Sequence, residues 1–160
     1  YGKHANTPFA RRTLLRTHFA FIEGMTYLLR QVALASEDIF SAAEQAALRE
    51  ETYLLDKQGR VQTQENFHKL LPSILFSLRC YARIHGASFE PDTSSRGWQC
   101  LQQYKRVRDR LTHPKCAADL YLSDDDLAAC TEGAEWFKET ILRMFRICDE
   151  ADKFYRSQCT

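Results

Sequence analysis

The sequence predicts an all-α protein, an up-and-down bundle of about five helices that forms a single domain over residues 1–160. Three observations predict this class. Only six glycines and four prolines interrupt the chain, which favours long helices. Apolar residues recur at spacings of three and four, the period of a helix that buries one face. No strand-like alternation of apolar and polar residues stands out.

The first helix is expected from Thr7 and Pro8 to about Ala35. Threonine is a good N-cap, and proline is favoured at the first helical position. An apolar line at spacings of four and three predicts the face that packs on the core. This line consists of Leu14, His18, Phe21, Met25, Leu28 and Val32, and it is flanked by Leu15, Phe19, Ile22 and Leu29.

The second helix is expected over about Asp38–Lys57 and the third over about Gln64–His85. The second is the weakest amphipath of the set, and Gly59 follows it as a stop. Pro72 lies inside the third, so we expect a kink there or a separate first turn. The segment Ala87–Gly97 carries Pro, Asp, Thr and Ser residues and is predicted to be a long loop.

The fourth helix is expected over about Ser95–Thr112, and Pro114 stops it. The fifth begins at Ser123, which can cap, and three aspartates follow where the helix dipole favours negative charge. Its apolar residues repeat at spacings of three and four for about four heptads, so we expect it to pack along a partner for most of its length. These residues run from Leu127 to Tyr155.

Charge and cysteine content narrow the function classes. The formal net charge is +1, so any electrostatic partner must be recognised by a local patch. The six cysteines are scattered singly within mostly apolar segments, which favours reduced thiols in a cytoplasmic protein. No signal peptide, membrane span or membrane partner is expected. The chain does not begin with Met, which suggests a piece of a longer protein.

One basic segment, KRVRDRLTHPK at residues 105–115, stands out in a neutral chain. It closes the predicted fourth helix, where the dipole favours cations, so a solvated helix end is the simplest interpretation. Two details favour a site instead. Arg108 follows Tyr104 by four residues and so shares the apolar stripe, where a guanidinium needs an anionic partner or a subunit interface. Asp109 and His113 are four residues apart, so the carboxylate can orient the imidazole.

These residue types suit metal-free RNA cleavage. Arginine can bind a phosphate, histidine can move protons, and a carboxylate can hold the histidine. The string Arg108-Asp109-Arg110-Leu111-Thr112-His113 resembles the R-x4-6-H motif of HEPN domains, in which the residue after the arginine is commonly Asn, Asp or His. The setting is similar too, because the motif closes one long helix, Pro-Lys follows, and another long amphipathic helix comes next.

The resemblance implies a HEPN-like helical domain that homodimerises and brings two motifs into one cleft. Active HEPN members are metal-independent endoribonucleases, whereas many members keep the motif without demonstrated cleavage and act in toxin–antitoxin or defence systems. Carried over, His113 is the general acid and base, Arg108 binds the scissile phosphate, and Asp109 is a polar helper. RNA or a nucleotide would be bound by further basic residues of the segment, namely Lys105, Arg106, Arg110 and Lys115. An antitoxin or another partner protein is a further expectation.

Three functions stay open at this point. The first is a HEPN-type ribonuclease acting as a homodimer. The second is a non-catalytic HEPN module whose basic cleft binds a nucleotide, RNA or a partner protein. The third is a structural dimerisation domain in which Arg108 is buried in an interface salt bridge.

Other candidate residues favour structural roles. His18 is interpreted as a core histidine, Glu23 as part of an ion network between Arg16 and Arg30, and His68 and His85 as surface residues. His113 and Cys116 lack a second spaced pair of ligands, so neither a metal nor another cofactor is expected.

Overall fold

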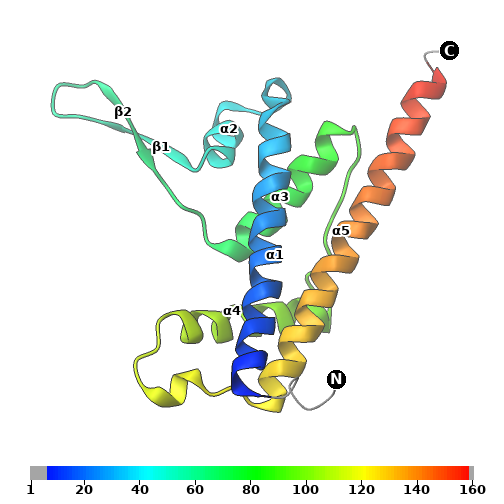
Figure 1. The fold of residues 1–160 in the computed structure, drawn as a ribbon. Coiled ribbons are helices and arrows are strands. Elements are labelled where there is room, and N and C mark those ends of the chain that lie inside the picture. The colour runs from blue at the N-terminus through cyan, green and yellow to red at the C-terminus, as the bar shows by residue number, and fades with distance from the viewer. Residues whose placement is uncertain (1–6, 159–160) are drawn as a thin grey trace. The chain divides into compact units, whose positions relative to one another are not determined.

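The computed structural model describes residues 7–158, which are mostly helical (Figure 1). Helices account for 71% of the structure, with little strand, so the all-α bundle class predicted from the sequence is confirmed. The five α-helices among the described residues are α1 (Pro8–Leu34), α2 (Ala42–Leu48), α3 (Leu70–Ile84), α4 (Arg96–Thr112) and α5 (Asp124–Gln158). Two short 3-10 turns, Glu37–Ile39 and Ala117–Leu120, join them.

The residue contacts group into two compact units. Within the described part of the chain, unit one contains residues 7–24 and 91–143, and unit two contains residues 25–90 and 144–158. Helices α1 and α5 each contribute residues to both units.

Unit one contains α4 with the first part of α1 and of α5. Ser95 caps α4 by accepting a hydrogen bond from the backbone of Trp98. At the start of α5, Ser123 and Asp126 each accept a hydrogen bond from the other's backbone N–H. The α4 and α5 segments meet closely, since a Cβ at Gly133 would lie 2.7 Å from the backbone nitrogen of Leu101. The core of this unit is rich in aromatic residues, including Phe19, Trp98, Tyr104, Trp136 and Phe137.

The buried face of α1 lies beside the line that the sequence predicts. The residues named as flanking are the buried ones, namely Leu15, Phe19, Ile22 and Leu29. Four residues of the predicted line, Leu14, Phe21, Leu28 and Val32, are between 44% and 55% exposed. Two adjacent apolar lines make an arc too wide for periodicity alone to identify its buried centre.

The predicted second helix is wrong over its second half. Helix α2 ends at Leu48, and Glu50 takes a positive φ of 55°. Strands β1 (Glu51–Leu55) and β2 (Val61–Glu65) follow as an antiparallel hairpin, in which Leu55 lies opposite Val61. The turn is held by Asp56, whose side chain accepts hydrogen bonds from the backbones of Gln58 and Arg60, and by Gly59 at φ 74°. The Glu- and Leu-rich residues of β1 continue the apolar periodicity of α2, so periodicity alone extends the helix up to the turn at Asp56–Gly59.

The third helix starts later than predicted. Residue Gln64 belongs to β2, and α3 begins at Leu70. Pro72 therefore occupies the third position of α3, where the proline removes no internal helix hydrogen bond. The expected kink is replaced by a helix start.

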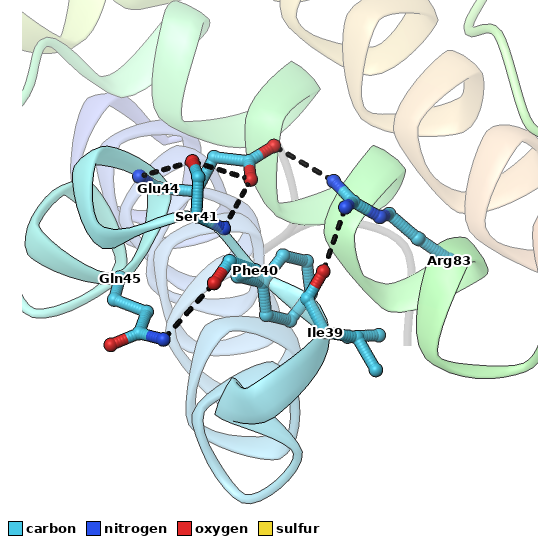
Figure 2. A network of polar contacts seen from close by, with 6 residues as sticks. All are labelled: Ile39, Phe40, Ser41, Glu44, Gln45 and Arg83. Atoms are coloured by element: carbon cyan, nitrogen blue, oxygen red, sulfur yellow. Dashed lines mark hydrogen bonds and ion pairs between the residues drawn. The ribbon is translucent and has the colours of Figure 1, made fainter.

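The core of unit two is closed by a network of polar contacts around Arg83 (Figure 2). The Arg83 guanidinium contacts a carboxylate oxygen of Glu44 at 2.8 Å and donates to the carbonyl of Ile39 at 2.7 Å. It also lies over the ring of Phe40, 5.2 Å from the centroid. Glu44 completes a capping box with Ser41, the N-cap of α2. The network thus holds the turn before α2 against α3 over a buried cluster of Ala33, Phe40, Leu48 and Cys80.

The two histidines of unit two are not simple surface residues. Nδ1 of His85 lies 3.0 Å from a carboxylate oxygen of Asp152, its Nε2 is buried, and its ring packs 4.8 Å from that of Tyr81. A ring nitrogen of His68 lies 3.2 Å from the carbonyl oxygen of Ala47. Asp152 is far from His85 in sequence, and Ala47 lies in a different element from His68. The sequence around each histidine therefore gives no sign of its partner, and both are predicted to be exposed.

Candidate functional site

Helix α4 is held in unit one by the side chain of Tyr104, which is fully buried. Its hydroxyl donates to the backbone carbonyl of Leu15 at 2.5 Å, and its ring contacts the Phe19 ring edge-on at 5.2 Å. Burial raises the pKa of the Tyr104 phenol, so the hydroxyl stays protonated and keeps donating at physiological pH. This anchor sets the position of the residues one and two turns later in α4.

Arg108 lies one helical turn beyond Tyr104, on the apolar stripe as predicted. Its guanidinium carbon is 4.8 Å from the centroid of the Phe19 ring, a cation–π contact. Nη2 contacts a carboxylate oxygen of Glu23 at 2.7 Å, and Nη1 donates to Asp109 at 3.3 Å. The anionic partner that an arginine on this stripe needs is therefore present within the chain.

Asp109 is held by two cations. Nζ of Lys105 lies 2.5 Å from one carboxylate oxygen, and Arg108 contacts the other. Partial burial raises the pKa of this carboxyl group, but the hydrogen bonds and positive charges of Lys105 and Arg108 outweigh it and lower the pKa below its usual value. Asp109 is thus ionised at neutral pH, and each of its two carboxylate oxygens already contacts a cation.

His113 is the C-cap residue of α4. Its backbone N–H donates to the carbonyl of Asp109 at 3.0 Å, with the backbone at φ −125° and ψ 61°. The imidazole is exposed and has no hydrogen-bond partner among residues 7–158. The expected contact between the Asp109 carboxylate and the His113 ring is not formed, because the helix ends at His113 and both carboxylate oxygens have other partners.

A shallow open depression of about 620 Å³ lies at this end of α4. Its lining residues are Asp109, Arg110, His113, Lys115 and Asp119. Arg108 is absent from the lining and lies toward Glu23. The structure therefore brings Asp109 and His113 to one hollow, and places the guanidinium of Arg108 outside it.

The other basic residues of the segment differ in availability. Arg110 is tied to unit one, since Nη2 contacts a carboxylate oxygen of Asp126 at 2.9 Å and donates to the carbonyl of Tyr121 at 3.0 Å. Lys105 is paired with Asp109. Arg106 and Lys115 are exposed, and within the described part of the chain neither side chain has a polar partner.

Two residues of the site were not identified from the sequence. Glu23 was assigned to an ion network with Arg16 and Arg30, whereas it pairs with Arg108, 85 positions away. Asp119 accepts hydrogen bonds from the backbones of Lys115 and Cys116, which lowers the pKa of its carboxyl group. The three-residue spacing from Cys116 to Asp119 is a capping pattern, and this signal could have identified Asp119 from the sequence. No sequence signal links Glu23 to Arg108.

Within residues 7–158, no group of three or more His, Cys, Asp or Glu side chains is arranged to hold a metal ion. Across the same residues, no helix combines the length and apolar character needed to cross a membrane.

Fold and geometry together define a class: an α-helical protein with a basic, histidine-ended helix C-terminus beside a shallow polar hollow. Comparison with protein-family models, curated proteins and solved structures finds no match to the chain.

Proposed function

We propose that this chain is a HEPN-type, metal-independent endoribonuclease that acts as a homodimer. The position of His113 supports this proposal most directly. Its ring is exposed, unbonded and placed beside a hollow whose lining includes Asp109, Asp119, Arg110 and the unpaired Lys115, so a phosphodiester there would meet Lys115 and a proton-transfer group together. The string from Arg108 to His113 supplies the resemblance to HEPN domains.

In the proposed reaction, the His113 imidazole accepts the proton of a ribose 2′-OH. The 2′-oxygen forms a bond to the adjacent phosphorus, and the bond from phosphorus to the 5′-oxygen breaks. The leaving 5′-oxygen takes up a proton, which yields a 2′,3′-cyclic phosphate and a 5′-hydroxyl. An imidazole suits both transfers because its ordinary pKa of about 6.5 is close to the working pH.

Arg108 would bind the scissile phosphate and stabilise its developing charge, which requires its guanidinium to leave Glu23 and turn toward the hollow beside His113. Contacts with Glu23 and Asp109 use two of the five N–H donors of a guanidinium, so others remain for a phosphate. In a homodimer, two copies of the motif would share one cleft, and Arg106 and Lys115 would contact RNA beyond the cleaved bond. A cytoplasmic toxin–antitoxin or defence system, with an antitoxin as partner protein, is the proposed setting.

Single-stranded RNA incubated with the protein in EDTA tests this proposal. Wild type should cut the RNA, and His113→Ala should lower the cleavage rate by roughly 10²–10⁴, the usual contribution of a general acid–base group. His18→Ala, a histidine of the same unit outside the motif, serves as the control and should cut like wild type. Equal cleavage by wild type and His113→Ala would exclude the proposed role.

The second candidate function is a non-catalytic HEPN module that binds RNA, a nucleotide or a partner protein. The two carboxylates around Arg108 favour it, because they neutralise the charge that the ribonuclease needs at the phosphate. Fluorescence anisotropy on the same RNA distinguishes the two. RNA that wild type binds but leaves intact over hours would indicate the binding module, while release of cyclic-phosphate ends would indicate the enzyme.

A further inference from the structure

The hairpin of unit two leaves both of its long edges unpaired. Strands β1 and β2 form a sheet of two strands, and no third strand pairs with it among the described residues (Figure 1). Two-stranded ribbons are marginally stable in water, and free strand edges readily pair with other chains. The hairpin is therefore the element most in need of a partner.

The outward-facing backbone groups of β1 can be identified from the ladder. Hydrogen bonds run from Asn66 to Glu50 and from Asp56 to Arg60, at the two ends of the hairpin. In an antiparallel ladder, successive residues alternate between facing the partner and facing outward. Glu51, Tyr53 and Leu55 therefore turn their N–H and C=O groups to the free edge, where no hydrogen bond is formed among residues 7–158.

The side chains distinguish the two edges. Strand β1 reads Glu-Thr-Tyr-Leu-Leu, and Tyr53, Leu54 and Leu55 are 50%, 52% and 71% exposed. Because side chains alternate along a strand, these three place apolar surface on both faces of β1. Strand β2 reads Val-Gln-Thr-Gln-Glu and is mostly polar. Burial of apolar surface thus favours pairing through the edge of β1.

Charges at the two ends of the hairpin specify what would pair there. At the base, Glu51 lies directly opposite Glu65, and like charges across a strand pair repel. At the tip, Lys57 and Arg60 have no side-chain partner in the described part of the chain. Asp56, beside them, is occupied by the backbone of the turn. The segment from Glu51 to Lys57 thus has an acidic start and an apolar middle in β1, and a basic end in the turn two residues beyond the strand.

Two copies of a segment with this order of charges are complementary when they lie side by side and run antiparallel. We infer that β1 pairs with β1 of a second copy of this chain across a two-fold axis, which joins the two hairpins into a four-stranded antiparallel sheet. With Glu51 of each copy beside Lys57 of the other, Leu54 would lie on the axis and Tyr53 would lie opposite Leu55 of the other copy. The free edge of β1 in each copy would then be paired, and the apolar side chains of β1 would be partly covered, while the polar edge of β2 would stay open.

Sedimentation velocity of the whole chain tests this contact with two matched variants. Tyr53 and Thr63 face each other across the hairpin, and the N–H of each faces outward on its own edge. Proline at either position removes an outward donor without removing a hydrogen bond of the hairpin. Tyr53→Pro should halve the molecular mass seen for wild type at the same concentration, whereas Thr63→Pro should keep it.

Charge exchange gives a second readout that introduces no proline; because Glu51→Lys also places a lysine opposite Glu65 within the hairpin, the double variant is the decisive comparison. Glu51→Lys and Lys57→Glu should each weaken self-association, and the double variant should restore it. Equal masses of wild type and Tyr53→Pro between 1 and 200 µM, on the order of ordinary dimer affinities, would overturn the inference. Loss of association in Thr63→Pro as well would also overturn it, since pairing would then not be specific to β1.

Discussion

At the residue scale, Arg108 shows which of its contacts follow from its position in α4 and which depend on distant residues. Its place on the stripe of α4 predicts that it needs an anion, and the structure supplies Glu23 for it. The pair is about a third to two fifths exposed, so its contribution to stability is small, about 0–1 kcal/mol. Its consequence is geometric, because Glu23 and the Phe19 ring hold the guanidinium away from the hollow beside His113.

The more buried ion pair of unit one joins Arg110 to Asp126, and it predicts a pH effect. Burial raises the pKa of the Asp126 carboxyl group. The hydrogen bonds from Arg110 and Ser123 lower it by a larger amount, so the pKa lies below its ordinary value. A lowered pKa stabilises the fold fully above the pKa of an unfolded aspartate, about 3.9, and this stabilisation is lost as the pH falls through the folded value.

We expect Asp126→Asn to reduce the free energy of unfolding by about 1–2 kcal/mol at pH 7, because it removes a charged hydrogen bond and weakens the cap of α5. The difference from wild type should persist to about pH 5 and shrink below about pH 4. Urea unfolding at pH 7, 5 and 3.5 measures it. Asp125→Asn, an exposed neighbour in the first turn of α5, is the control, and an equal loss there would refute the role of the pair.

At the element scale, close helix contact and turn geometry matter more than helix propensity. Gly133 lies where α5 meets the backbone of α4, and a Cβ there would lie 2.7–3.0 Å from atoms of Leu101 and Cys100. Gly24, in α1, has nothing within 4 Å of the place where a Cβ would lie. Gly24 and Gly133 both follow a glutamate within a long helix, yet their structural roles are opposite.

Gly133→Ala should therefore lower the free energy of unfolding by about 1–3 kcal/mol, because the helices must move apart. Gly24→Ala should raise it by roughly 0.5–1 kcal/mol, because alanine favours the helix. Thermal and urea unfolding of the two variants, followed by circular dichroism, measure both signs. A neutral or stabilising Gly133→Ala would show that α4 and α5 do not approach as closely as described.

At the scale of the whole molecule, the cysteines report on burial in both units. The five described cysteines are free, and four of them are buried. Burial raises the pKa of Cys80 and Cys148 to about 11 and that of Cys130 to about 12, and it also raises the pKa of Cys100. Thiols with such values hold almost no reactive thiolate at neutral pH. Cys116 is exposed, and Cys159 lies outside the described residues.

Brief alkylation with iodoacetamide at pH 7.5 should modify Cys116 and leave the four buried thiols unmodified in the native protein. Peptide mass spectrometry identifies the modified sites. In guanidinium chloride all of them should react, which provides the control for intrinsic reactivity. Rapid native labelling of Cys80 or Cys148 would contradict the packing of unit two, and labelling of Cys100 or Cys130 that of unit one.

Much of the fold follows from the sequence because helix periods and caps are local signals. The bounds of α1 and α4 and the start of α5 lie within about one residue of those predicted, and Thr7-Pro8 and Ser123 are the start signals of α1 and α5. The hairpin was missed because a Glu- and Leu-rich segment continues the pattern of α2, and the turn at Asp56–Gly59 was interpreted as a helix stop. Strand pairing depends on contacts between separate segments, which periodicity does not record.

The sequence by itself determined the helical class, the basic end of α4 and the three residues Arg108, Asp109 and His113 as candidates. Tertiary structure alone decided what each can do. In the structure, Glu23 pairs with Arg108, and Asp109 contacts Lys105 and Arg108. The His113 ring forms no hydrogen bond among residues 7–158. The physical reason is that propensity and spacing act within one or two helical turns, whereas ion pairing depends on which distant side chains packing brings within about 4 Å.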